Sequence, residues 1–235
     1  EMEINAAADH GVDVFIYDWY WYDNRPYLEE SLNQGYLNAS NNDRVQFYLM
    51  WANHDAQTIW DKRLSDENNI TVWDGSQNRA EFEKICQRLI SKYFSHPSYY
   101  RINGKPVFMI YDLNNLIEGL GSVQKTRDAL DWFRKQAQAE GLEGLHLHAT
   151  LKKGLNNITG ISGDKNTVQK DVIEALGFDG LTHYQFVHFL DINKDYNKIV
   201  EEAVTNWQQL SQKYNIPYYP HVSIGWDNNP RFKNL

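Results

Sequence analysis

The 235-residue sequence lacks several features that mark particular classes of protein. Its single cysteine, Cys86, excludes an internal disulfide and lies on the apolar face of a helical pattern, where we expect a small core residue. No apolar run approaches the roughly 20 residues that a membrane-spanning helix needs. No glycine-rich phosphate loop follows the first strand-like run, which disfavours an open nucleotide-binding sheet. The sequence therefore predicts no membrane span.

An excess of positive charge is also absent. The chain has 23 Lys and Arg against 31 Asp and Glu, so its formal net charge is −8. Proteins that hold phosphate backbones usually present a basic stripe, and this sequence has none. We therefore expect no nucleic-acid partner. A chain of this length can bury a single large core.

Aromatic residues are abundant, with 8 Trp and 15 Tyr. Both side chains combine a flat apolar face with a polar group. Sugar rings have flat C–H faces bordered by hydroxyls, so this composition suits carbohydrate binding. A core rich in aromatics explains it equally well, and composition alone does not separate the two.

Short apolar runs alternate with amphipathic patterns along the chain. Apolar residues repeat at three and four in 82–93 and again in 196–210, where Asp195 is the expected N-cap. Weaker helical patterns cover 27–37, 123–139 and 167–176. Six strands are predicted between them, at Val12–Trp19, Val45–Trp51, Pro106–Tyr111, Leu145–Ala149, Gly180–Tyr184 and Tyr218–Ser223.

This alternation predicts the α/β class, with parallel strands joined by right-handed crossovers. The repeat length of roughly 30–40 residues fits a (β/α)8 TIM-like barrel. Six strands are counted where such a barrel has eight. We therefore expect residues 1–235 to form one barrel domain that is incomplete in this chain, with its first and last strands missing.

The ends of the predicted strands carry polar and aromatic side chains. Active sites of such barrels lie at the carboxyl ends of the strands, so these residues predict a ligand-binding site there. The candidates for substrate binding are Asp18, Trp19, Tyr20, Trp21, Trp51, Asn53, His54, Asp55, Asp112, His148, His183, Tyr184, Trp226 and Asp227.

Four segments carry a family resemblance. They read GVDVFIYDWYWYDNRPYLEESL, VQFYLMWANHD, KPVFMIYDL and PHVSIGWDNNPRF. In this order they resemble the glycoside hydrolase family 99-like domain, which is also described as a WbsX-type glycosyltransferase. The resemblance implies a barrel enzyme that acts on a glycan or polysaccharide, with hydrolysis of α-mannosides as the typical activity. It implies no metal and no cofactor, and it favours a periplasmic or extracellular location.

The resemblance also implies a retaining mechanism through a 1,2-anhydro sugar, with one glutamate as base and another as acid. That glutamate pair lies near the end of the family's domain, in an Asn-Glu-Trp-type segment that this sequence does not contain. No glutamate here ends a predicted strand, so the catalytic residues are unassigned and expected outside this segment. Asp18 and Asp227 are expected to bind hydroxyls or to orient those glutamates. His54 stands where related proteins commonly have an acidic or amide residue, which puts the substrate in question.

Other functions fit parts of the pattern. A non-catalytic glycan-binding barrel would keep the aromatic cleft without a carboxylate pair. A glycosyltransferase would use the same cleft, but the sequence has no Asp-x-Asp motif or phosphate loop for a nucleotide sugar. A metal-dependent hydrolase could use His146 and His148, which share one face of a strand, together with His183.

A calcium-loop pattern covers Asp191–Asn197, with Glu202 at its twelfth position. Position six of such a loop should be glycine and is Tyr196. The simpler interpretation is the capped start of a helix.

Overall fold

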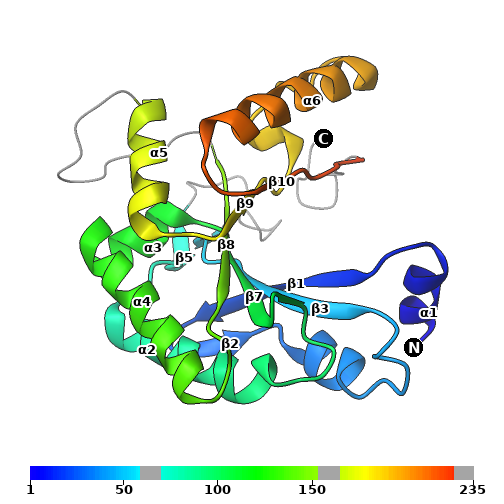
Figure 1. Cartoon of the computed structure of the whole chain (residues 1–235), viewed down its shortest axis with the longest axis vertical. Helices are drawn as coiled ribbons and strands as arrows, with labels where there is room; N and C mark the ends of the chain where they lie inside the picture. Colours follow the sequence, from blue (N-terminus) through cyan, green and yellow to red (C-terminus); the bar gives the residue numbers. More distant parts are fainter. Residues whose placement is uncertain (59–69, 153–164, 225–235) are drawn as a thin grey trace.

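The computed structural model describes residues 1–58, 70–152 and 165–224, and its centre is a curved parallel sheet (Figure 1). The strand order is β10-β9-β8-β7-β3-β1, and each neighbouring pair in it is parallel. All six predicted strands are confirmed, with bounds shifted by a few residues. They are β1 (Val14–Tyr22), β3 (Gln46–Trp51), β7 (Lys105–Ile110), β8 (His146–Thr150), β9 (Gly180–Thr182) and β10 (Tyr218–Tyr219).

The sheet does not close in the described part of the chain. There, β1 and β10 stand at opposite ends of the parallel order, and no strand pairs with both. The expected open barrel of six parallel strands is therefore confirmed for these residues. The candidates Trp226 and Asp227 lie outside the described residues.

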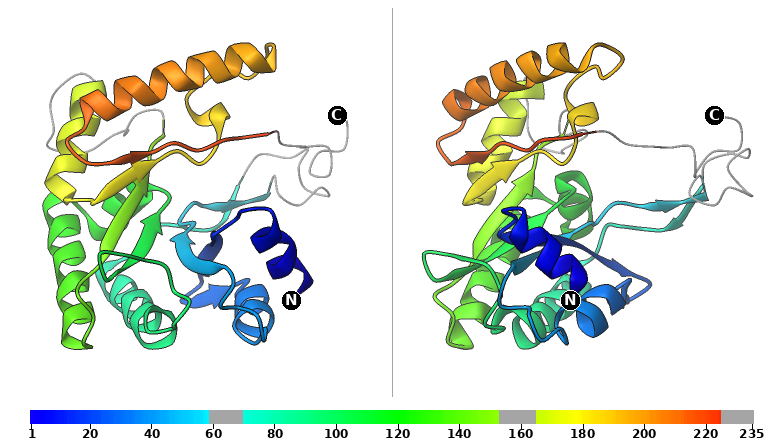
Figure 2. Two further views of the ribbon diagram at one scale, coloured as in Figure 1. Left: turned by 45° about the vertical axis from the view of Figure 1, so that its right-hand side comes forward. Right: turned by 90° about the vertical axis from the view of Figure 1, so that its right-hand side faces the viewer.

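Helices lie on the outer side of the sheet, as Figures 1 and 2 show. The predicted helical patterns correspond to α2 (Arg79–Leu89) with η3 (Ile90–Phe94), α4 (Val123–Ala139), α5 (Lys165–Leu176), α6 (Tyr196–Lys213) and the short η1 (Ser31–Tyr36). The opening residues also have a helical pattern, and α1 (Met2–Asp9) forms there. Two further helical segments were not predicted: α3 (Leu113–Leu120) and η4 (Phe186–His188). Within the described ranges, no helix has the length and apolar character to cross a bilayer.

The start of α6 is capped as the sequence predicts. The Asp195 carboxylate accepts a hydrogen bond from the backbone N–H of Asn197. Lys194 Nζ donates to both carboxylate oxygens of Glu202, at 2.9 and 2.7 Å. These contacts belong to a capped helix, the simpler of the two interpretations of this segment.

Three short hairpins were missed by the strand assignment. They pair β2 (Arg25–Tyr27) with β1, β6 (Arg101–Ile102) with β7, and β4 (Ala56–Gln57) with β5 (Thr71–Trp73). The second hairpin turns at Asn103-Gly104, where both φ angles are positive, at 49° and 76°. An Asn-Gly pair just before an apolar run is a strong hairpin signal that was available in the sequence.

Pairing register places a row of side chains on the inner face of the sheet. Asp18 is opposite Met50, which is opposite Met109, which is opposite His148. The outer face packs against the helices, where Cys86 of α2 is fully buried as expected. Since side chains alternate along a strand, this register decides which residues face the interior.

Candidate functional site

The strand β1 divides its aromatic run between its two faces. Asp18, Tyr20 and Tyr22 line a cavity, while Trp19 and Trp21 point to the other face and are 2% and 6% exposed. The Trp19 indole N–H donates to Glu29 at 2.7 Å, and that of Trp21 donates to Glu81 at 3.3 Å. This alternation explains a strand that ends in mixed aromatic and acidic residues, because one set packs and the other faces the cavity.

The cavity has a volume of about 920 Å³ and lies at the carboxyl ends of the strands. This size is at the upper end of the range typical of small-molecule sites, about 300–1,000 Å³. Four of the predicted candidates line it, namely Asp18, Tyr20, His54 and Tyr184. The other described lining residues are Tyr22, Tyr27, Leu28, Met50, Ala52, Tyr111, Gln185, Phe186, Val187, Ile192, Lys194, Tyr196, Ile199, Ser223 and Ile224.

Four rings form a continuous wall around the polar end of this cavity, which we call the aromatic belt: Tyr20, His54, Tyr111 and Tyr184. Their ring centroids lie 5.8, 5.5 and 5.2 Å apart in that order, each pair meeting edge to face. Such geometry is favourable for aromatic pairs and fixes each ring. The belt therefore offers fixed ring surfaces to a ligand.

Asp18 is the acidic group of this belt. Its Oδ2 accepts a hydrogen bond from the Tyr184 hydroxyl at 2.9 Å. Burial raises the pKa of the Asp18 carboxyl, and the Tyr184 hydrogen bond and nearby His54 pull it back in part. Burial also lowers the pKa of His54. Asp18 is thus a partly desolvated acceptor beside donors and rings.

A polar network behind the belt holds the loops in place. Asn53 exchanges two hydrogen bonds of 2.7 Å with the backbone of Asp112. Asp112 caps α3 and forms a 2.7 Å ion pair with Lys152, whose Nζ lies 3.7 Å from the Tyr111 ring centre. Asp55 accepts the backbone N–H of Gly75 at 2.9 Å. Asn53, Asp55 and Asp112 do not line the cavity, and their contacts position the residues that do.

Trp51 also lies away from the cavity. It is 1% exposed, and its ring centre lies 6.2 Å from that of Phe82 on α2. Trp19, Trp21 and Trp51 thus pack on the helix side of the sheet. Tyrosine rings and not tryptophan rings face the cavity in the described residues.

Two of the three candidate histidines, His148 and His183, lie on different faces of the sheet. His148 is on the inner face, 4% exposed, with its ring stacked on Tyr219 at 4.9 Å. Thr182 pairs with Thr150 on the inner face, so His183 points to the opposite side, where its Nδ1 is 2.7 Å from the Tyr218 hydroxyl oxygen. No three metal-ligating side chains gather anywhere in the described ranges, and the metal alternative lacks its histidine set there.

Acid is expected to destabilise the fold through these histidines. Burial, with help from His221 and His188, lowers the pKa of His183 to about 3, and burial with His146 lowers that of His148 to about 4. The unfolded chain binds these protons near pH 6.5, so stability is complete above that pH and falls as the pH drops toward 4. The slope reaches about 1.4 kcal/mol per pH unit for each histidine. Urea unfolding at pH 7, 6 and 5 measures this change in the free energy of unfolding. Identical stability at all three values would contradict the prediction.

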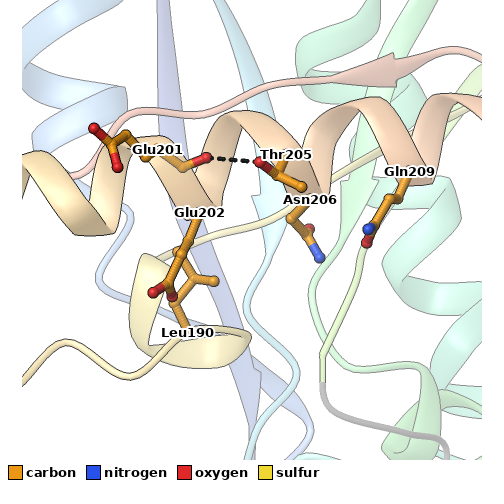
Figure 3. Close-up of a pocket in the computed structure, with 6 residues that line it drawn as sticks. All are labelled: Leu190, Glu201, Glu202, Thr205, Asn206 and Gln209. Carbon is orange, nitrogen blue, oxygen red and sulfur yellow. Dashed lines mark hydrogen bonds between the residues drawn. The ribbon is translucent and has the colours of Figure 1, made fainter.

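A second, shallower hollow of about 470 Å³ lies on α6 (Figure 3). It is bordered by Leu190 and by polar residues of α6, among which the Thr205 hydroxyl donates to the Glu201 backbone oxygen. None of the predicted site residues lines it. Its polar groups are those of an ordinary helix surface.

Several cavity residues were missing from the sequence candidates. Tyr111 ends a predicted strand, and Tyr22 follows the predicted end of another by three residues. Strict alternation from Asp18 would have selected Tyr20 and Tyr22 over Trp19 and Trp21. Tyr27 and Leu28 come from the unpredicted β1–β2 hairpin, and Lys194 from the approach to α6. Those residues carry no local signal, since only the tertiary fold brings them to the cavity.

A curved parallel sheet with helices on its outer side and a cavity at the carboxyl ends of its strands is the arrangement of the TIM-like barrel class. The whole chain, residues 1–235, matches the family described as Glycosyltransferase WbsX. The chain therefore belongs to the WbsX family. It is 22% identical over 244 residues to an uncharacterized protein, WxcX, from each of two strains of Xanthomonas campestris pv. campestris. That match covers 97% of this chain and 30% of each relative, so the chain spans less than a third of their length.

Solved structures confirm the barrel-type fold. The GH99 endo-alpha-mannosidase from Bacteroides thetaiotaomicron matches with a TM-score of 0.54 and 15% identity, covering 98% of this chain and 54% of that one. A glycoside hydrolase-like protein matches with a TM-score of 0.57 and 14% identity, covering 94% of this chain and 61% of that one. The predicted resemblance to the family 99-like, WbsX-type domain is thereby confirmed.

Proposed function

We propose that this chain forms the sugar-binding part of a carbohydrate-active enzyme, a retaining glycoside hydrolase that acts on α-mannoside-like glycans. One observation carries the proposal: a single partly buried carboxylate, Asp18, lies within an aromatic belt at the carboxyl edge of a barrel-type sheet. The fold shared with glycoside hydrolases and the family membership support it.

The belt and Asp18 have the chemistry that a pyranose requires. Flat rings at Tyr20, Tyr111 and Tyr184 match the C–H faces of a sugar. Asp18 accepts hydrogen bonds from sugar hydroxyls, and a bond to a charged acceptor contributes about 1.5–3 kcal/mol. Burial keeps water from competing for the carboxylate.

Hydrolysis of a glycosidic bond needs two carboxyl groups beside the bond. Asp18 is the one carboxylate among the described lining residues. We therefore place the catalytic glutamate pair outside the described residues, as the family resemblance implies. Asp18 is assigned the binding of hydroxyls, and the acid and base roles are left to that pair.

Two other functions each have a supporting observation. A non-catalytic glycan-binding barrel is favoured by the same single carboxylate, because binding needs no pair. A glycosyltransferase is favoured by the description of the family. Both use the same cavity and differ in what happens to the bound sugar.

The experiment that separates these functions is a glycan-release assay on the natural full-length protein. We would incubate it with α-mannan and mixed bacterial polysaccharides, with and without a chelator. Release of reducing sugar that survives chelation is the expected result. Release lost on chelation would contradict the metal-free mechanism. Binding without release would favour the binding barrel, and sugar transfer from a nucleotide donor would favour the transferase.

The hydroxyl of Tyr184 provides a smaller test of the site. Tyr184→Phe removes the donor to Asp18 and keeps the ring, so the pKa of Asp18 should rise further. We expect mannoside affinity at pH 7 to fall a few-fold, about 1 kcal/mol for one hydrogen bond, and to fall more at pH 5. Titrations at both pH values measure this. Tyr100→Phe, which changes a half-buried tyrosine outside the cavity lining, is the control and should bind normally.

A further inference from the structure

The cavity has two chemically different ends. Asp18, His54 and Tyr184 make its inner end polar. Its rim carries Leu28 from the β1–β2 hairpin on one side and Val187 and Ile192 from the segment around η4 on the other. These three aliphatic side chains are 57%, 46% and 46% exposed. Lys194 and Tyr196 also line the cavity. The three aliphatic side chains offer a sugar hydroxyl no hydrogen-bond partner, so the surface they form does not suit a second sugar.

Exposed apolar side chains concentrate at this one place. Fourteen large hydrophobic residues are exposed in the described chain, and six of them line this cavity. Exposed apolar side chains that line the same cavity as a polar end are typical of a ligand-binding groove. The patch therefore belongs to the same ligand as the polar end.

The backbone at Leu28 adds an independent observation. Its φ is +57°, in the left-handed region that leucine rarely occupies. Glycine or asparagine would adopt this conformation with less strain. A bulky side chain held there, exposed at the rim of a cavity, indicates that the side chain serves a purpose other than folding.

We propose that the rim binds a saturated hydrocarbon group attached to the sugar, so that the substrate class is an amphipathic glycan with an alkyl aglycone. This inference rests on the proposed sugar site, because the polar end must hold the sugar while the rim holds the chain. Leu28 and Ile192 would then act as specificity-determining residues on opposite walls of the cavity.

Titration of the chain with methyl α-mannoside and octyl α-mannoside, below the micelle concentration, tests the inference. Burying one CH2 group strengthens binding about four-fold, so even partial burial of an octyl chain should improve affinity about ten- to a hundred-fold. Equal affinity for the two glycosides would overturn the inference and leave the sugar site intact. No binding of either would overturn both proposals.

Substitutions at the rim test whether its residues cause the higher affinity for octyl α-mannoside. Leu28→Asn should remove most of the octyl advantage, measured as the ratio of octyl to methyl α-mannoside affinity. It should leave Tm the same or higher, since asparagine tolerates this φ. Ile192→Ser should also reduce the octyl advantage from the opposite wall. The matched control is Val204→Ser, an α6 residue 39% exposed and outside the cavity lining, which should change nothing. An octyl advantage retained in both rim variants would contradict the assignment.

Discussion

Asp18→Asn is expected to weaken binding of methyl α-mannoside by about 10- to 100-fold at pH 7. The substitution keeps the size of the side chain and removes its charge, and a hydrogen bond to a charged group contributes about 1.5–3 kcal/mol. The carboxylate has two acceptor oxygens and the amide has one. If that oxygen accepts the Tyr184 hydroxyl as Oδ2 does now, at 2.9 Å, no side-chain acceptor is left for the sugar. Calorimetric or fluorescence titration of the wild-type and variant chains measures the change.

The pH dependence of methyl α-mannoside binding is a second test of the Asp18 charge. Burial raises the pKa of Asp18, so the carboxylate loses its charge at a higher pH than an exposed aspartate does. Wild-type affinity should therefore decline as the pH falls through that raised pKa. Asp18→Asn should show no such decline, because it has no proton to gain at this position.

Asp13→Asn is the matched control for this prediction. Asp13 precedes β1 in the chain, is exposed and does not line the cavity. Its replacement removes the same charge from the protein and should leave the affinity unchanged. Equal binding by the wild type and Asp18→Asn at pH 7 would contradict the site placement.

The parallel sheet was predictable because each of its strands is a short apolar run that can be recognised in the sequence. Runs such as Val45–Trp51 and Pro106–Tyr111 are apolar on both faces, as strands buried on both sides must be. Helices with a complete apolar stripe, such as α6, were equally clear. The helix α3 was missed because it is only eight residues long and follows β7 after Tyr111 and its capping Asp112.

The site was predictable only in part, because each strand end offers side chains to two faces. Asp18, Tyr20, His54 and Tyr184 line the cavity, but Trp19 was also selected, although it packs under the helices. The aromatic type suggested sugar stacking for all of them alike. The tryptophans differ from the cavity residues in that each indole N–H donates to a carboxylate, Trp19 to Glu29 and Trp21 to Glu81. The sequence does not show these partners, because only the tertiary fold brings their segments close to β1.

Glu29→Ala is expected to cause the largest loss of stability among the predicted variants. Glu29 is 8% exposed and accepts hydrogen bonds from Trp19 Nε1 at 2.7 Å, the Tyr93 hydroxyl at 2.9 Å and Arg88 Nε at 2.9 Å. Arg88 Nη2 also bonds its second oxygen. Arg88 is 30% exposed, so water partly compensates its charge when Glu29 is removed. The buried Trp19 indole N–H loses its acceptor, and a buried donor left without a partner costs about 1–3 kcal/mol. Urea unfolding at pH 7 measures the change.

The pKa of Glu29 predicts where this contribution is lost with pH. Burial alone would raise the pKa, but the hydrogen bonds from Arg88, Trp19 and Tyr93 outweigh it and lower the pKa to about 2. The unfolded chain binds this proton near pH 4.3. The contribution is therefore complete above that pH and declines as the pH falls toward 2, a lower window than that of the buried histidines.

Two further variants separate the ion pair from the general effect of a mutation. Glu30→Ala changes the neighbouring exposed glutamate and should alter stability by less than about 0.5 kcal/mol. Arg88→Ala made in the Glu29→Ala background should cost less than Arg88→Ala alone, because the guanidinium has already lost its partner. Additive losses in the double variant would mean that the two side chains act independently. That outcome would contradict the ion pair as a source of stability.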